Sequence, residues 1–125
     1  HLLGIETPAQ AKRDPLRGGL YENLMILEIL KSRYNRGIRP EIYFFRDTNA
    51  NEVDLIIRRQ RKLIPVEIKS AATYTKSFLK GLLMFKDLTP DACAPGYVLY
   101  NGATQFHVKG VLVQNIFLHG CGPCD

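Results

Sequence analysis

The stretch of sequence that decides the fold is Glu52–Ser70, which reads EVDLIIRRQRKLIPVEIKS. Two runs rich in β-branched residues, 52–59 and 62–70, lie on either side of Gln60-Arg61. Such runs around a two-residue break predict a β-hairpin. Because side chains alternate between the two faces of a strand, the positions of the acids and the lysine within these runs can be predicted as well.

Alternation separates the apolar residues of the first strand from its acid. One face is expected to carry Val53, Leu55 and Ile57, and the other Asp54 and Ile56. In the second strand, Glu67 and Lys69 share a face with Pro65, which is an unusual placement for an acid and a lysine in an apolar strand. Because proline lacks an amide hydrogen, Pro65 predicts a strand edge or a bulge beside them.

The hairpin is expected to bring two carboxyl groups together. A turn centred between Gln60 and Arg61 places Asp54 across from Glu67, with Cβ atoms about 4.5–5.5 Å apart. Facing like charges destabilise a sheet unless one acid is protonated or a cation lies between them. A hard divalent ion such as Mg²⁺ binds carboxylate oxygens, and Lys69 would then orient or help to deprotonate an attacking water.

A second interpretation remains open for these three residues. On a solvated sheet face, Asp54, Glu67 and Lys69 would form ordinary surface ion pairs. The register decides between the two, because Gln-Arg is not a favoured two-residue turn and a slip of one residue would place the acids on opposite faces.

Helices are expected before and after the hairpin. Leu20, Leu24, Leu27 and Leu30 recur at helical spacing, so a helix that packs deeply is predicted from Leu20 to about Tyr34, closed by Gly37. A second helix is predicted from Thr75 or Lys76 to Leu88, and Pro90 ends it.

Further strands are expected at 41–46, 96–100 and 106–117, with Asn101-Gly102 as a hairpin turn. The order helix, three strands, helix and strands predicts an α/β or α+β fold. All 125 residues are expected to form one domain, with 1–19 as a lead-in segment. A chain that begins with His1 is expected to have been cut from a longer one.

Composition narrows the class of protein. With 46% hydrophobic and 23% charged residues, the chain is expected to be globular and soluble, and no apolar run approaches the length of a membrane span. A net charge of +5 and a pI near 9.2 favour a polyanionic partner.

Three cysteines, Cys93, Cys121 and Cys124, are too few for a secreted disulfide scaffold of this length, so a cytoplasmic location is expected. The lone CxxC at 121–124 lacks the context of a zinc or redox motif, and residues 119–125 are interpreted as a flexible tail.

Basic residues offer a surface for nucleic acid. Around the predicted hairpin turn lie Arg58, Arg59, Arg61 and Lys62, and after the first helix lie Arg33, Arg36 and Arg39. The alternative is a solvated turn and a helix end, where basic residues are also common. Glu22, in the first turn of the helix, likewise has an alternative role in complementing the helix dipole.

Four motifs follow one another along the chain: GGLYEN at 18–23, YFFRD at 43–47, NEVD at 51–54 and PVEIKS at 65–70. In this order they resemble the C-terminal domain of unknown function of a large family of prokaryotic P-loop ATPases of the AAA type. That domain is similar to the PD-(D/E)XK nuclease superfamily, which includes restriction endonucleases and archaeal Holliday-junction resolvases. The resemblance is clear over residues 1–88 and looser beyond.

The resemblance implies a restriction endonuclease-like α/β fold, with helices flanking a central four-stranded mixed sheet in the order α-β-β-β-α-β. It assigns Glu22 as the acid from the first helix, Asp54 as the acid that begins the motif, and Glu67-Ile68-Lys69 as its (D/E)XK. In active members the acids bind one or two Mg²⁺ ions, and the lysine assists the water that cleaves a phosphodiester, usually of DNA.

Two functions remain open at this point. The first is a Mg²⁺-dependent nuclease that uses Glu22, Asp54, Glu67 and Lys69. The second is a non-catalytic module that docks an ATPase to DNA or to another protein. The chain has no GxxxxGK[ST] motif, so the ATPase domain is expected upstream in the full-length protein. No membrane partner is expected, and the sequence predicts no oligomeric state.

Overall fold

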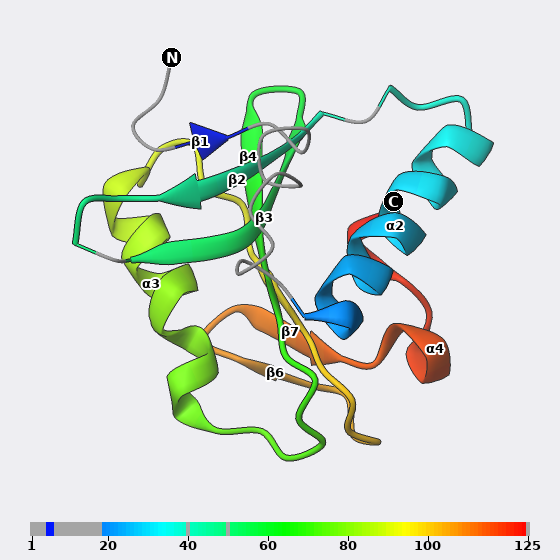
Figure 1. The fold of residues 1–125 in the computed structure, drawn as a ribbon. Coiled ribbons are helices and arrows are strands. Elements are labelled where there is room, and N and C mark those ends of the chain that lie inside the picture. The colour runs from blue at the N-terminus through cyan, green and yellow to red at the C-terminus, as the bar shows by residue number, and fades with distance from the viewer. Residues whose placement is uncertain (1–4, 7–18, 40, 50, 125) are drawn as a thin grey trace.

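The computed structural model describes residues 5–6, 19–39, 41–49 and 51–124 (Figure 1). The strands are β1 (Ile5–Glu6), β2 (Ile42–Arg46), β3 (Glu52–Arg59), β4 (Lys62–Ile68), β5 (Tyr97–Leu99), β6 (Phe106–Val108) and β7 (Val111–Gln114). The helices are α2 (Leu20–Asn35), α3 (Lys80–Leu88) and α4 (Ile116–His119), with 3-10 turns η1 (Lys76–Leu79) and η2 (Gly122–Cys124). The expected lead-in segment, residues 1–19, lies almost entirely outside the described residues.

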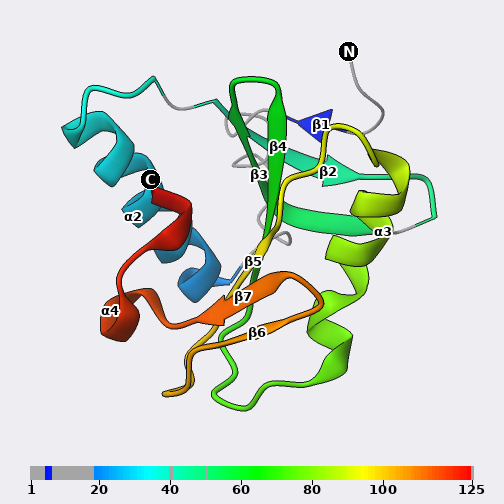
Figure 2. The ribbon, with the colours of Figure 1, turned by 180° about the vertical axis from the view of Figure 1, so that it is seen from behind.

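The strands form one mixed sheet of seven strands in the order β1-β2-β3-β4-β5-β7-β6. Strands β1 to β4 are antiparallel neighbours, whereas β4, β5 and β7 run parallel. Helix α2 covers one face and α3 the other (Figures 1 and 2). The fold is therefore α/β, and the order α2, β2, β3, β4, α3, β5 is the order that we expected.

Two apolar cores hold these layers together. The α2-side core packs Met25, Ile26 and Ile29 of the helix against strand residues such as Leu55 and Val66. In the α3-side core, side chains of η1 and α3 pack against side chains of the sheet. The former are Phe78, Leu79, Leu82 and Phe85, and the latter include Val53, Ile56 and Val98. Nearly all these side chains are fully buried, so the central strands β3, β4 and β5 are covered on both faces.

The prediction for the buried face of α2 is wrong for three of its four leucines, whereas Leu30 packs against the α2-side core. Leu20, Leu24 and Leu27, expected to face the core, are 78%, 46% and 50% exposed. The opposite side of the helix, with Met25 and Ile29, is buried instead. The reason is that α2 is apolar almost all round, so spacing alone did not distinguish its two faces.

The predicted hairpin and its register are confirmed. Residues Gln60 and Arg61 form the turn, and Leu55 pairs with Val66 as the centred turn requires. Gln60 adopts a positive φ of 57°, a conformation that costs a non-glycine residue about 1 kcal/mol. Burial of β3 and β4 on both faces fixes the register despite this unfavoured turn. Pro65 was expected to mark either a strand edge or a bulge. Because β4 is a central strand, Pro65 does not mark an edge of the sheet.

A β-bulge interrupts β3 at the position of the first acid. Tyr43 pairs with Ile56 and Phe45 pairs with Val53, so Asp54 and Leu55 together oppose one residue of β2. The expected alternation fails here: Val53 belongs to the α3-side core, whereas Leu55 and Ile57 belong to the α2-side core. The extra residue reverses the faces because it shifts the two-residue period by one.

The C-terminal part differs from the predicted strands. The hairpin turn between β6 and β7 is Lys109-Gly110, with φ values of 49° and 80°, rather than Asn101-Gly102. Residues 116 and 117, predicted as the end of a strand, instead begin the helix α4. The segment interpreted as a flexible tail, 119–124, contains η2, which packs beside α2 (Figure 2). None of the helices in the described part of the chain combines the length and the apolar character needed to cross a membrane.

Candidate functional site

The two hairpin acids meet where β3 and β4 separate. The recorded β3–β4 ladder ends at Leu55 and Val66. One step further, the Asp54 amide donates a hydrogen bond to Oε1 of Glu67 at 3.3 Å, and the Ile68 amide donates to Oδ2 of Asp54 at 2.8 Å. At this level the carboxyl oxygens accept the amide hydrogen bonds that backbone carbonyls accept elsewhere in the ladder. Each acid thus accepts a hydrogen bond from the backbone of the opposite strand.

The separation has a cause in the sheet topology. From Val66 onward β4 pairs in parallel with β5, and the Lys69 amide donates to the Leu99 carbonyl at 2.8 Å. The bulge bends β3 at the same level, because an extra residue increases its local twist. The sheet therefore forks at Asp54 and Glu67, and the acids fill the fork.

Burial changes the protonation of both acids. The pKa of Glu67 is raised to about 8, chiefly because burial removes its carboxyl group from water and secondly because of the charge of Asp54. The pKa of Asp54 is also raised by burial, although the Ile68 amide and the Lys69 ammonium oppose this. At neutral pH the pair holds a proton. The interpretation as solvated surface ion pairs is wrong for Glu67, which is 6% exposed.

Lys69 links the buried acid to solvent. Its Nζ lies 3.5 Å from Oε2 of Glu67 and 5.8 Å from the centre of the Phe78 ring. The lysine side chain is 39% exposed, whereas that of Glu67 is 8% exposed. The ammonium group therefore lies where a molecule approaching the fork would meet it first.

Glu22 approaches the fork from α2. A hydrogen bond between the Glu22 and Asp54 side chains lowers the pKa of Asp54. Glu22 belongs to the helix on one face of the sheet, whereas Glu67 faces α3 on the other, so Asp54 connects the two sides. Within the described residues, no group of three or more His, Cys, Asp or Glu side chains has the arrangement of a metal site. The four expected site residues therefore contact one another in series: Glu22 contacts Asp54, Asp54 contacts Glu67, and Glu67 contacts Lys69. They do not surround a single point.

Gly81 is a site residue that the sequence did not reveal. A Cβ atom at Gly81 would lie 2.6 Å from the Glu52 carbonyl oxygen and 3.3 Å from Oε1 of Glu67. A glycine here therefore lets α3 pack directly onto β3 and the Glu67 carboxyl group. One glycine inside an apolar helix gave no signal of this contact.

A family model described as a domain of unknown function, DUF4143, matches residues 17–118. The chain belongs to this family. No curated protein and no solved structure matches the chain. The match spans the helix that carries Glu22, the fork and α3, so the site lies wholly within the DUF4143 domain.

The predicted basic surface lies away from the fork of the DUF4143 domain. Arg59 is five residues along β3 from Asp54, or roughly 17 Å at the usual rise per residue. The hairpin that carries Arg58, Arg59, Arg61 and Lys62 extends from the body of the sheet (Figure 1). All four are exposed, although Arg58 pairs with Glu41 at 3.7 Å.

Arg33 does not belong to the surface formed by these arginines and lysine. It is 3% exposed, and its Nε and Nη1 atoms have no hydrogen-bond partner. Burial lowers the pKa of this guanidinium group, and the nearby charge of Arg59 lowers it further. Arg36 and Arg39, in contrast, are exposed after the helix as expected.

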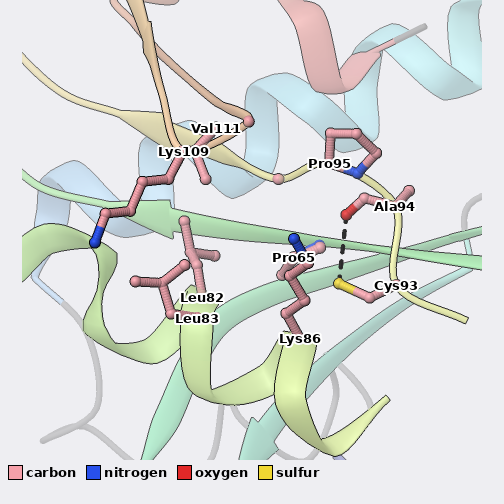
Figure 3. A pocket seen from close by; sticks show the side chains of 11 residues that line it. Pro65, Leu82, Leu83, Lys86, Cys93, Ala94, Pro95, Lys109 and Val111 are labelled. Carbon is pink, nitrogen blue, oxygen red and sulfur yellow. Dashed lines mark hydrogen bonds between the residues drawn. The ribbon is translucent and has the colours of Figure 1, made fainter. Parts of the chain in front are cut away.

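The DUF4143 domain also has a cavity of about 140 Å³ next to α3 (Figure 3). Its walls come from Pro65, from α3, from the 93–96 loop and from the β6–β7 turn. Leu82, Leu83 and Val111 make them mainly apolar, and the exposed Lys86 and Lys109 also line the cavity. None of the four predicted site residues lines it, so this cavity is separate from the fork.

Proposed function

We propose that this DUF4143 domain is a metal-dependent nuclease of the restriction endonuclease-like type, acting on a phosphodiester of DNA. In this proposal Asp54, Glu67 and Glu22 bind Mg²⁺, and Lys69 positions the attacking water. The observation that carries the proposal is the fork, where two carboxyl groups and an ammonium group converge inside an otherwise apolar sheet.

The location of these groups favours a function over a structural role. Placing the buried Glu67 carboxyl group beside the partly buried Asp54 carboxyl group costs free energy, because both lose water and their charges repel once both are ionised. An apolar pair would complete the β3–β4 ladder without this cost. The bulge and Gly81 both accommodate the acids, so several local features favour a polar site where the sheet would be more stable without one.

The donor set suits a hard divalent cation. Carboxylate oxygens are the ligands that Mg²⁺ prefers, and it is often held by one or two protein carboxylates while it keeps several waters. Asp54 and Glu67 would supply these oxygens once the proton of the pair is lost. Glu22, which is hydrogen-bonded to Asp54, would join them after a change of rotamer. The bound cation would stabilise negative charge that develops on the phosphate.

The lysine has a distinct role in this proposal. Because its Nζ contacts Glu67 and remains accessible to solvent, Lys69 can orient a water molecule beside the scissile phosphate or neutralise charge there. The Phe78 ring next to the ammonium group restricts its position.

Titration calorimetry with MgCl₂ and MnCl₂, in the presence of a short DNA duplex, tests the metal site. We expect Asp54→Asn and Glu67→Gln each to weaken metal binding at least tenfold. Glu28, a partly exposed acid of the same helix, provides the matched control for Glu22→Gln, and Glu28→Gln is expected to bind as the wild type does.

Cleavage of linear and branched DNA tests the reaction itself. We expect Lys69→Met to lower the cleavage rate at saturating metal by about 10²–10⁴-fold, the usual contribution of such a group. Unchanged metal binding in both carboxamide variants, or wild-type protein that cleaves no DNA with either metal, would refute the proposal.

The second candidate function, a non-catalytic docking module for an ATPase, has one observation in its favour. Leu20, Leu24 and Leu27 form an exposed apolar stripe along α2, and such a surface is typical of contact with another protein. Metal binding without cleavage, together with loss of ATPase association in Leu24→Lys, would favour this function over the nuclease.

A further inference from the structure

The last described turn of the chain holds two cysteines in unlike surroundings. Cys121 and Cys124 form a disulfide that closes the loop Cys121-Gly122-Pro123-Cys124. Cys124 is 5% exposed and belongs to the α2-side core, whereas Cys121 is only partly buried at the margin of that core. A thiol that approaches from solvent can therefore reach the sulfur of Cys121 more easily than that of Cys124.

Three elements hold this loop in place independently of the disulfide. The Gly122 amide donates to Oε1 of Gln114 in β7 at 2.9 Å, and a Cβ at Gly122 would lie 2.4 Å from the Tyr97 ring in β5. Nη1 of Arg36, just after α2, donates to the Cys124 carbonyl at 3.3 Å. These contacts involve the backbone and neighbouring side chains, so they keep the two sulfur atoms close when the disulfide is open. This proximity favours re-formation of the intramolecular disulfide.

We propose that Cys121 and Cys124 form a reversible dithiol–disulfide site that exchanges with small dithiols. One thiolate of the dithiol attacks Sγ of Cys121, the Cys121–Cys124 bond breaks, and its electron pair goes to Sγ of Cys124, which takes a proton from water. The second thiol of the reductant loses its proton and attacks the mixed disulfide. This step releases Cys121, which is protonated in turn, and the cyclic oxidised reductant. Two electrons and two protons thus pass to the protein.

The exchange also changes how η2 packs. Bonded sulfur atoms lie about 2.05 Å apart, whereas non-bonded atoms need about 3.5–4 Å, so opening the bond separates the two side chains by roughly 1.5 Å or more. Cys124 is packed into the α2-side core and Cys121 is only partly buried at its margin, so we expect the Cys121 side chain to take up most of this shift. Reduction therefore leaves the hydrogen bonds of Gly122 and Cys124 in place but removes the covalent restraint on η2, which is expected to fluctuate more.

Single-thiol proteins test which of the two sulfur atoms is accessible from solvent, the premise of attack at Cys121. Cys93→Ala with Cys124→Ser leaves Cys121, and Cys93→Ala with Cys121→Ser leaves Cys124. Each protein is incubated with oxidised glutathione, and the mixed disulfide is followed by mass spectrometry. We expect Cys121 to react at least tenfold faster than Cys124, and equal rates or a faster reaction at Cys124 would overturn the proposal.

Wild-type protein gives a second test that needs no substitution. It is equilibrated with mixtures of reduced and oxidised dithiothreitol, quenched with iodoacetamide and digested, so that each cysteine is counted. Cys121 and Cys124 should gain and lose the label together and reversibly, while Cys93, a free thiol whose pKa is raised by burial, behaves the same in every mixture. Independent labelling of Cys121 and Cys124, or failure to reoxidise, would overturn reversible pairing.

Hydrogen exchange reports on the movement of η2. On reduction we expect faster exchange at the amides of Gly122 and Cys124, and unchanged exchange in the β3–β4 hairpin; Pro123 has no amide hydrogen. Identical exchange in the oxidised and reduced proteins would overturn the predicted loosening.

Discussion

Glu67 keeps a proton at pH values where an ordinary glutamate has lost it. Its pKa is raised to about 8, whereas in the unfolded chain it would be near 4.3. Between these values the folded state binds more protons than the unfolded state, so the free energy of unfolding falls as pH rises. We expect Glu67→Gln, which has no proton to lose, to flatten this slope and to exceed wild-type stability at pH 9 by about 1–3 kcal/mol. Urea unfolding at pH 5.5, 7 and 9 measures the effect.

The control for this pH dependence is an acid with an ordinary environment. The Glu28 side chain is 45% exposed and contacts Lys31 at 3.9 Å, so Glu28→Gln should retain the wild-type slope. A wild-type stability that stays constant or rises between pH 5.5 and 9 would show that burial does not hold the proton on Glu67. The sequence predicted that Asp54 and Glu67 would face each other, and left a protonated acid and a bound cation open as alternatives, because the choice depends on how α3 covers the fork.

At the scale of the element, α3 packs on the sheet through one glycine. Gly81→Ala places a methyl group 2.6 Å from the Glu52 carbonyl, so the helix must shift away from β3. Alanine normally stabilises a helix by about 0.5–1 kcal/mol over glycine, but here we expect a loss of about 1–3 kcal/mol. Thermal or urea unfolding gives the sign directly. Gly19→Ser, at a helix start with nothing within 4 Å, is the control and should be neutral or slightly stabilising. A stabilised Gly81→Ala protein would contradict the close contact.

Helices and strands were predictable where the sequence pattern allowed only one arrangement. The β3–β4 hairpin and its register followed from two apolar runs with one short break between them, and both are confirmed. The buried face of α2 was not predictable, because leucines line one side of the helix and Met25 and Ile29 the other. The bulge at Asp54 arises from the pairing of β3 with β2. It could not be predicted from the alternation of residues within β3 alone.

At the scale of the whole molecule, the acids and the basic hairpin lie at different places on the same two strands. A DNA backbone bound at the fork would have to extend along β3 to reach Arg59, a distance of roughly 17 Å. This equals several phosphate spacings of a duplex, so both regions can contact one DNA segment. The composition predicted a polyanionic partner from the net charge, and the sequence placed these basic residues at the predicted turn, five positions from Asp54; the confirmed hairpin register gives the same separation.

The salt dependence of DNA binding tests this arrangement. Arg59 and Arg61 are exposed on the hairpin, and replacing both by glutamine should reduce the slope of log K against log salt by up to about 2, since each lost phosphate contact removes about 0.9. Lys86→Gln with Lys109→Gln makes the same change of charge beside the cavity and should leave the slope nearly unchanged. Fluorescence anisotropy with a labelled duplex between 50 and 200 mM salt measures both. If the two double variants changed the slope equally, net charge would determine binding, and the hairpin would have no specific role in placing DNA across the fork.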